Sequence, residues 1–101
     1  MKEQALDLLE AGYRSAVSRE IEGRTVFMFR DSDAASAVGL STATRDTPEA
    51  RTYRQVMESM LDSGAVAIPP IRAQESVGVT FYVITWHGID MLREAGRIEQ
   101  S

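Results

Sequence analysis

The first 22 residues carry apolar side chains at the spacing of an amphipathic helix. These side chains recur at intervals of three and four residues, which places them on one helical face, while charged residues occupy the other. They are Leu6, Leu9, Tyr13 and Val17. Glu22 and Gly23 form a turn signal that ends the segment. The pattern therefore predicts a helix over residues 1–22.

A strand and a short helix are predicted next. Residues 24–30 are rich in β-branched and aromatic side chains and carry an arginine at each end, which is typical of a strand with apolar groups on both faces. The carboxylates at residues 31–33 can accept hydrogen bonds from the free N–H groups of a helix over residues 34–38. Gly39 can end that helix. Residues 41–47 are polar and unpatterned, so their conformation stays open.

The clearest helix signal covers residues 47–62. Thr47 is a typical cap, Pro48 suits the first helical position, and Glu49 places an acid near the positive helix end. Apolar side chains then follow on one face, and residues 63–64 are a stop signal. The apolar positions are Ala50, Tyr53, Val56, Met57, Met60 and Leu61.

The C-terminal part predicts a hairpin followed by a last helix. Residues 65–68 form a short apolar strand, and the two prolines after it cannot donate to a sheet, so the chain leaves the sheet there. A loop over residues 69–78 then leads to a second, antiparallel strand over residues 79–85. Thr85 can cap a helix over residues 86–96.

Three stretches of this chain resemble the winged helix-turn-helix family. Residues 35–41, Ala-Ser-Ala-Val-Gly-Leu-Ser, look like the family's second helix and turn. Residues 56–66 look like the end of a recognition helix that runs into the first wing strand. Residues 82–92 are similar to the Tyr-x-Leu-Thr-x-x-Gly-x-x-x-Leu pattern that follows the wing in many bacterial regulators. The resemblance covers about residues 31–96 and implies an α+β fold of winged helix-turn-helix type.

Two features depart from the family pattern. About eight extra residues lie between the turn and the third helix, and the first strand is longer than this fold usually needs. A chain of 101 residues with 44% apolar side chains has the length of one domain. We expect a single winged-helix-like domain over residues 1–101. Its parts are an N-terminal helix (1–22), a strand (24–30), a helix-turn-helix (31–63), a wing hairpin (65–85) and a C-terminal helix (86–96).

The composition excludes several classes of function. The chain has no cysteine and one histidine, which argues against disulfides, thiolate zinc sites and most transition-metal centres. We therefore expect no cofactor and no metal. No apolar run approaches the roughly 20 residues that span a bilayer, and acidic residues occupy the place of a signal peptide. The expected location is the cytoplasm, without membrane contact.

Charge is distributed unevenly along this acidic chain, whose formal net charge is −4. Residues 24–54 form the only segment with more basic than acidic residues, five against four. An anionic ligand is therefore expected there. The five cations are Arg24, Arg30, Arg45, Arg51 and Arg54.

The family resemblance implies a duplex DNA interface on the third helix and the wing. In such folds the N-terminal half of the third helix enters the major groove. Arginine can bridge guanine, glutamine can bind adenine, and threonine hydroxyls can contact phosphate. The alternative is that these residues form an ordinary solvated helix face. The candidate DNA contacts are Arg45, Thr47, Arg51, Thr52, Arg54, Gln55 and, on the wing, Arg72.

An enzymatic function is not expected. His87 has Asp90 three residues further on, but the segment around it has the pattern of a helix start with a half-exposed ring. The chain also has no glycine-rich phosphate loop and no metal-ligand spacing. We expect no catalytic residue.

Two partner hypotheses remain beside DNA. Leu8 lies off the main apolar stripe of the first helix, so this helix could form a homodimer contact. The alternative for Leu8 is the edge of a wide stripe that faces the core. The rival function is a winged-helix protein-interaction module that binds no DNA and contacts a protein through its third helix or its long first strand.

Overall fold

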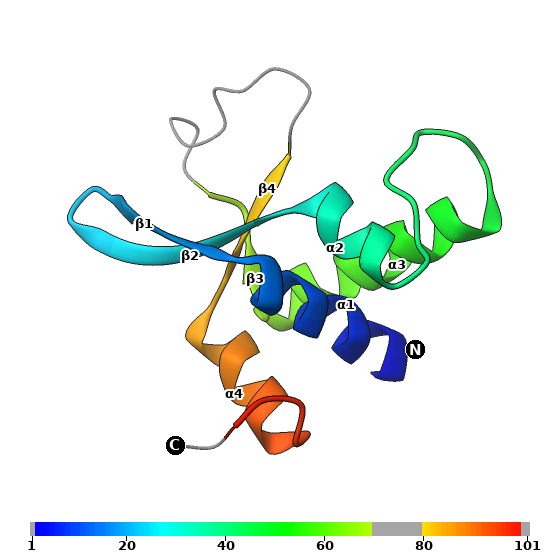
Figure 1. Cartoon of the computed structure of the whole chain (residues 1–101). Helices are drawn as coiled ribbons and strands as arrows, with labels where there is room; N and C mark the ends of the chain where they lie inside the picture. The colour runs from blue at the N-terminus through cyan, green and yellow to red at the C-terminus, as the bar shows by residue number, and fades with distance from the viewer. Residues whose placement is uncertain (1, 70–79, 100–101) are drawn as a thin grey trace.

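The computed structural model of the chain describes residues 2–69 and 80–99 (Figure 1). Its class is α+β, as expected, with helices packed against an open antiparallel sheet. The elements, in chain order, are α1 (Lys2–Ser15), β1 (Val17–Ile21), β2 (Arg24–Arg30), α2 (Asp31–Ala37), α3 (Pro48–Ser63), β3 (Val66–Ala67), β4 (Phe81–Ile84) and α4 (Trp86–Glu94).

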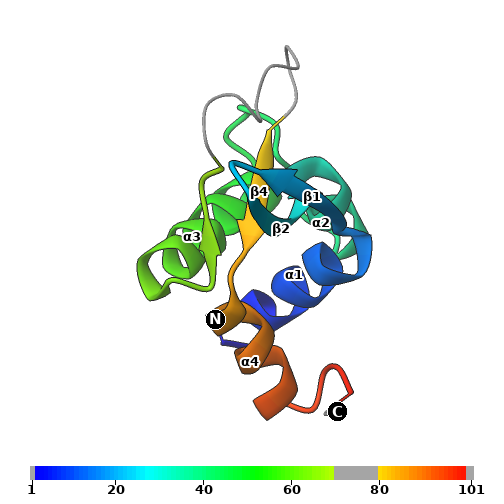
Figure 2. The ribbon, with the colours of Figure 1, turned by 90° about the vertical axis from the view of Figure 1, so that its left-hand side faces the viewer.

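The four strands of the sheet follow the order β1-β2-β4-β3, and all neighbours are antiparallel. Ile84 of β4 lies between Phe27 of β2 and Val66 of β3, which fixes the register. Viewed along the hairpin of β1 and β2, α3 lies on one side of β4, α1 and α2 lie on the other, and α4 lies at the bottom (Figure 2).

One face of the sheet forms the core with the helices. Side chains alternate between the two faces of a strand, and Phe29, Val66 and Ile84 share the face that packs against the helices. The other core residues come from α1, α2, α3 and α4. On the opposite face of β1 and β2, Met28 is buried outside that core cluster, whereas Arg19, Arg24 and Arg30 are exposed.

The predicted N-terminal helix over residues 1–22 is wrong beyond Ser15. Residues 17–21 form β1, which pairs with β2 across a two-residue turn at Glu22 and Gly23. Both turn residues have positive φ, 51° and 79°, as a type I′ hairpin turn requires. Val17 continues the helical spacing by coincidence, and Ser18 to Ile21 show no strand alternation in polarity or burial that would have marked the change.

Glu22 is the only non-glycine residue at positive φ in the described part of the chain. Asparagine adopts this left-handed conformation at lower cost than glutamate. We therefore expect Glu22→Asn to raise the free energy of unfolding by about 0.5–1 kcal/mol in urea denaturation. Glu20→Asn, in the extended part of β1, is the matched control and should not stabilise, because strands disfavour asparagine. An unchanged or reduced stability of Glu22→Asn contradicts this turn geometry.

The three leucines of α1 are buried within the chain. Leu8, which lies off the predicted stripe, is 0% exposed, and Leu6 and Leu9 are also buried. The broad core-facing stripe is therefore confirmed as the correct interpretation of Leu8. The leucines that suggested a homodimer through this helix pack in the core, whereas Tyr13, the other apolar residue behind that hypothesis, is only partly buried.

The signals around α3 and the glycine after α2 are confirmed. The predicted capping of α2 by the carboxylates at residues 31–33 is wrong, because Arg30 is the N-cap and its side chain makes no capping hydrogen bond. α2 begins at Asp31, three residues earlier than predicted, and Gly39 follows it at φ 75°. The Thr47 hydroxyl oxygen accepts a hydrogen bond from the Ala50 N–H at 3.2 Å, and Gly64 ends α3 at φ 81°. Residues 41–47, whose conformation the sequence left open, form an irregular connection rather than an extension of α2.

The predicted antiparallel pair after α3 is present, with shorter strands than expected. β3 covers only Val66–Ala67, and β4 covers Phe81–Ile84. Most of the predicted loop between them lies outside the described residues. α4 ends at Glu94 rather than at residue 96, and Thr85 caps it by accepting a hydrogen bond from the Gly88 N–H at 3.0 Å.

Candidate nucleic-acid interface

The N-terminal half of α3 presents a polar stripe on the side opposite its buried face. Arg51, Arg54 and Gln55 are exposed, and Thr52 is half-buried beside them. The buried face anchors the helix in the core through Tyr53, Val56, Met57 and Met60. The structure thus brings together, on one accessible surface, the candidate residues that the sequence placed on this helix.

A hydrogen bond between two side chains contributes to the placement of α3. The Tyr53 hydroxyl donates to Asp31 Oδ2 at 3.3 Å, which connects α3 with the first residue of α2. Burial raises the pKa of Tyr53 above its ordinary value, and the nearby Asp31 carboxylate raises it further, so the hydroxyl stays protonated as a donor. The sequence analysis treated Tyr53 only as an apolar core position.

The predicted contacts at the start of α3 differ in their availability. Thr47 is half-buried and its hydroxyl oxygen already serves as the helix cap. Arg45 is exposed in the connection before the helix. The Nε atom of Arg51 lies 3.2 Å from Asp46 Oδ1, with the two side chains 57% and 80% exposed. So exposed an ion pair contributes at most about 1 kcal/mol, which leaves Arg51 easily transferred to a phosphate.

The polar stripe changes sign along the helix. Glu58 and Asp62 are exposed further along α3, toward its C-terminal end. These carboxylates repel a polyanion, so only the first two turns of α3 suit one. Arg72, the predicted contact on the wing, lies outside the described residues.

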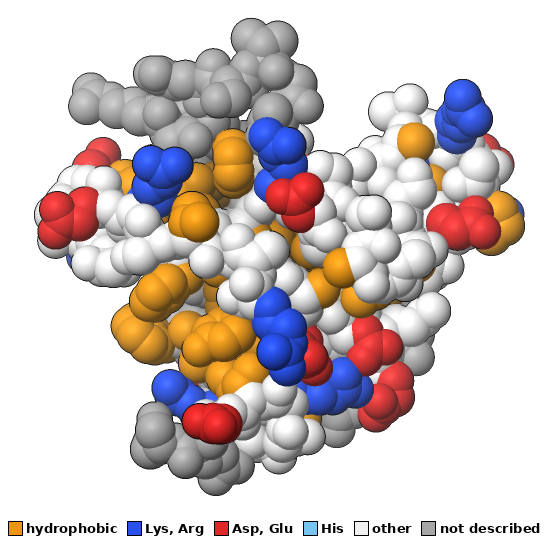
Figure 3. Space-filling view, in the orientation of Figure 1, with side chains coloured by type: hydrophobic (Ala, Val, Ile, Leu, Met, Phe, Trp, Pro, Cys, Tyr) orange, Lys and Arg blue, Asp and Glu red, His pale blue; other side chains and the backbone are white. Residues whose placement is uncertain are grey.

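The arginines fall into two groups according to their intramolecular partners. Arg14, Arg51, Arg93 and Arg97 form ion pairs with carboxylates, and Arg97 contacts three acidic residues of α1. For the others, no ion pair with a carboxylate is found within residues 2–69 and 80–99. This second group lies on the hairpin, the connection before α3 and α3 itself, and Figure 3 shows blue side chains over the first two. Its members are Arg19, Arg24, Arg30, Arg45 and Arg54.

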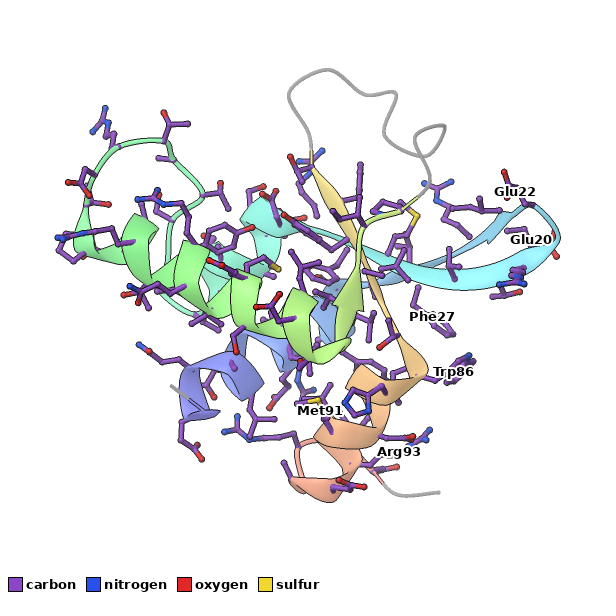
Figure 4. All side chains as sticks on the ribbon, turned by 180° about the vertical axis from the view of Figure 1, so that it is seen from behind. Glu20, Glu22, Phe27, Trp86, Met91 and Arg93 are labelled. Atoms are coloured by element: carbon purple, nitrogen blue, oxygen red, sulfur yellow. The ribbon has the colours of Figure 1, made fainter. Side chains whose placement is uncertain are left out.

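The structure also shows an aromatic groove that the sequence analysis missed. Phe27 extends from β2 toward the start of α4, where its ring lies edge-on to Trp86 at 5.9 Å (Figure 4). The groove has a volume of about 560 Å³ and is completed by Tyr13, Ala16 and Ile89, with Arg14 and Arg93 at its rim. Trp86 is 67% exposed. No local signal places Phe27 beside Trp86, because the contact depends on the pairing of β2 with β4.

Other candidate chemistry is not assembled in the part of the chain that the structure covers. His87 is exposed, and the Asp90 carboxylate lies 3.5 Å from Arg93 Nη1 instead. Within this part, no three His, Asp or Glu side chains are arranged to hold a metal ion. None of its helices combines the length and apolar character needed to cross a membrane.

Comparisons with known proteins supply no relative. No protein-family model matches the chain, and no curated protein or solved structure matches it either. Functional inference therefore depends on the surfaces described above.

Proposed function

We propose that this chain is a cytoplasmic, winged-helix DNA-binding protein of the transcriptional-regulator type, with the N-terminal half of α3 in the major groove. The strand order β2-β4-β3 and the chain order α1, β2, α2, α3, β3, β4 support a winged-helix arrangement. In that arrangement the third helix is the element that meets DNA. β1 is an addition to it at the edge of the sheet.

The exposure of Arg54 and Gln55 on the first two turns of α3 is the observation that carries the proposal. Arg54 has no ion pair with any described carboxylate, so its charge is available to a phosphate or to guanine. Gln55 adds a side chain able to bind adenine. Arg45 and Arg51 flank them and extend the cationic surface.

The proposed unit is one copy of the chain. Regulators of this type are commonly dimers, but Leu6, Leu8 and Leu9 of α1, which suggested a dimer, are buried in the core. In a single copy, three phosphate contacts by Arg45, Arg51 and Arg54 contribute about −3 to the slope of log affinity against log salt.

Removal of two α3 arginines tests the proposal. We expect Arg51→Ala combined with Arg54→Ala to weaken binding to a fluorescently labelled 24-base-pair duplex by about 30-fold or more at low salt. The expected loss follows from about 1–3 kcal/mol per contact. Fluorescence anisotropy at several salt concentrations measures both the affinity and the slope.

A charge variant on the same helix is the matched control. Glu58→Gln combined with Asp62→Asn should retain binding or improve it slightly, because it removes repulsion without removing a contact. Two results contradict the proposal: no binding of the unmodified protein at low salt, or equal affinity of the double arginine variant.

A protein-interaction module is the second candidate function. It is favoured by the aromatic groove, where Phe27 and the exposed Trp86 form a surface that is more apolar than DNA recognition needs. The same experiment separates the two functions, since absence of DNA binding at low salt favours the protein-interaction module.

A further inference from the structure

The alternation of β1 and β2 places their arginines and their single strand carboxylate on opposite faces. The pairs Arg19↔Val26 and Ile21↔Arg24 put both of these arginines on the face away from the core. Arg30, six residues after Arg24, shares that face. Glu20 lies on the other face, in register with Thr25.

We call this surface the open hairpin face. It carries three exposed cations between apolar residues and no carboxylate from either strand. Its exposed residues are Val17, Arg19, Arg24 and Arg30; Ile21 and Val26 are half-buried, and Met28 is buried at 5% exposure.

The cations of the open hairpin face are spread out rather than convergent. Arg19 and Arg24 are diagonal neighbours across the two strands, about 7–8 Å apart. Arg30 lies about 20 Å further along β2, at about 3.3 Å per residue. None of the three has an ion pair with a carboxylate of the described chain. Such an array matches a repeating polyanion better than a single small anion, which needs donors that meet at one point.

The shape of the hairpin also suits a nucleic acid. A two-stranded antiparallel ribbon is one of the elements that the major groove of B-DNA admits. The hairpin extends away from the helices at the end of the molecule opposite the start of α3 (Figure 1). The molecule is 39 Å long, which corresponds to about 11 base pairs of duplex at 3.4 Å each.

We propose that the open hairpin face is a second phosphate-binding surface, which contacts the same duplex as α3 through Arg19 and Arg24. This inference rests on the proposed function, because it assigns a further contact to the DNA ligand of α3. It predicts that two separate parts of the chain determine affinity and that a duplex must exceed a minimum length to reach both.

The test combines Arg19→Gln with Arg24→Gln and measures anisotropy on labelled duplexes of 24 and 8 base pairs. Each phosphate contact contributes about 0.9 to the salt slope, so the slope on the 24-base-pair duplex should become shallower by about 2. Affinity for that duplex should fall about tenfold or more at low salt. The 8-base-pair duplex is too short to span both surfaces, so its affinity should change less.

Two control variants test whether the effect requires unpaired arginines on the open hairpin face rather than any change of charge. Glu20→Gln, on the opposite face of the same strand, should leave the slope unchanged. Arg14→Gln removes a cation that is already paired with Glu10, and it should also leave the slope unchanged. Denaturant unfolding of every variant confirms that these exposed substitutions preserve the fold.

The outcomes distinguish this inference from the proposed function. An unchanged slope for the Arg19 and Arg24 variant, with binding still sensitive to Arg51 and Arg54, overturns the second surface alone. Sensitivity to Arg19 and Arg24 without sensitivity to the α3 arginines overturns the role of α3 and supports the hairpin contact. No binding by the unmodified protein overturns both. Competition by poly-glutamate as effective as that by unlabelled duplex also overturns the inference, because it indicates an acidic protein partner.

Discussion

Replacement of Gly88 by alanine is expected to reduce the free energy of unfolding by about 3 kcal/mol or more. A Cβ atom at Gly88 would lie 2.2 Å from the Ala65 carbonyl oxygen and 3.1 Å from its carbonyl carbon. Both are backbone atoms, and the same oxygen accepts a hydrogen bond from the Thr85 N–H at 3.2 Å. The methyl group therefore forces the start of α4 away from the segment that leads into β3.

The expected loss of stability is opposite in sign to the usual effect of replacing a helical glycine with alanine. Glycine to alanine inside a helix ordinarily stabilises by up to about 1 kcal/mol, because alanine has the higher helix propensity. His87→Ala, at the exposed neighbouring position of α4, is the control and should stay within about 0.5 kcal/mol. Urea or thermal unfolding measures both variants. A Gly88→Ala protein as stable as the parent contradicts the close packing of α4 on Ala65.

Leu8→Ala is expected to destabilise the chain by about 3 kcal/mol. Leu8 is 0% exposed and lies in the core cluster, so truncation removes buried apolar surface and leaves a cavity. Trp86→Ala removes a larger side chain that is mostly exposed, and its cost should be much smaller.

The dependence of the melting temperature of Leu8→Ala on protein concentration tests whether Leu8 lies instead at a homodimer contact. Folding coupled to dimerisation makes the melting temperature rise with protein concentration. We expect no such dependence through α1, either in the parent or in Leu8→Ala. Leu8 belongs to a subunit contact if Leu8→Ala melts at the same temperature as the parent at low protein concentration but at a lower temperature than the parent at high concentration.

The best sequence predictions concern elements whose ends have local chemical causes. α3 was predicted over residues 47–62 and extends over Pro48–Ser63, because the Thr47 cap, Pro48 and Gly64 act within one turn of the helix. α4 was located for the same reason, through the Thr85 cap. Such signals need no information from distant parts of the chain.

β1 was missed because a strand depends on its partner. Residues 17–21 form a strand only when β2 returns alongside them, and they have no alternating pattern of their own to set against the helical spacing that reaches Val17. The Glu22-Gly23 turn was the one local signal, and it was interpreted as a helix end. Arg19, placed in a helix by that interpretation, could not be assigned to the open hairpin face.

The candidate site was predictable in position but not in its pairings. The helical period alone indicated that Arg51, Arg54 and Gln55 share an exposed face. The ion pair of Arg51 with Asp46 depends on the irregular path of residues 41–47, for which the sequence has no pattern. The partly buried hydrogen bond from Tyr53 to Asp31 likewise joins residues 22 positions apart.

The extra strand β1 also has a consequence for solubility. An exposed sheet edge is a template on which further chains can assemble into insoluble fibres. β1 covers the outer edge of β2, whose central residues are aromatic or apolar, and becomes the boundary of the sheet itself. β1 is only five residues long, and its centre carries the charged residues Arg19 and Glu20. A further strand that paired with β1 would have to desolvate one positive and one negative charge. At this edge of the sheet, the short and charged β1 therefore disfavours the addition of a further strand.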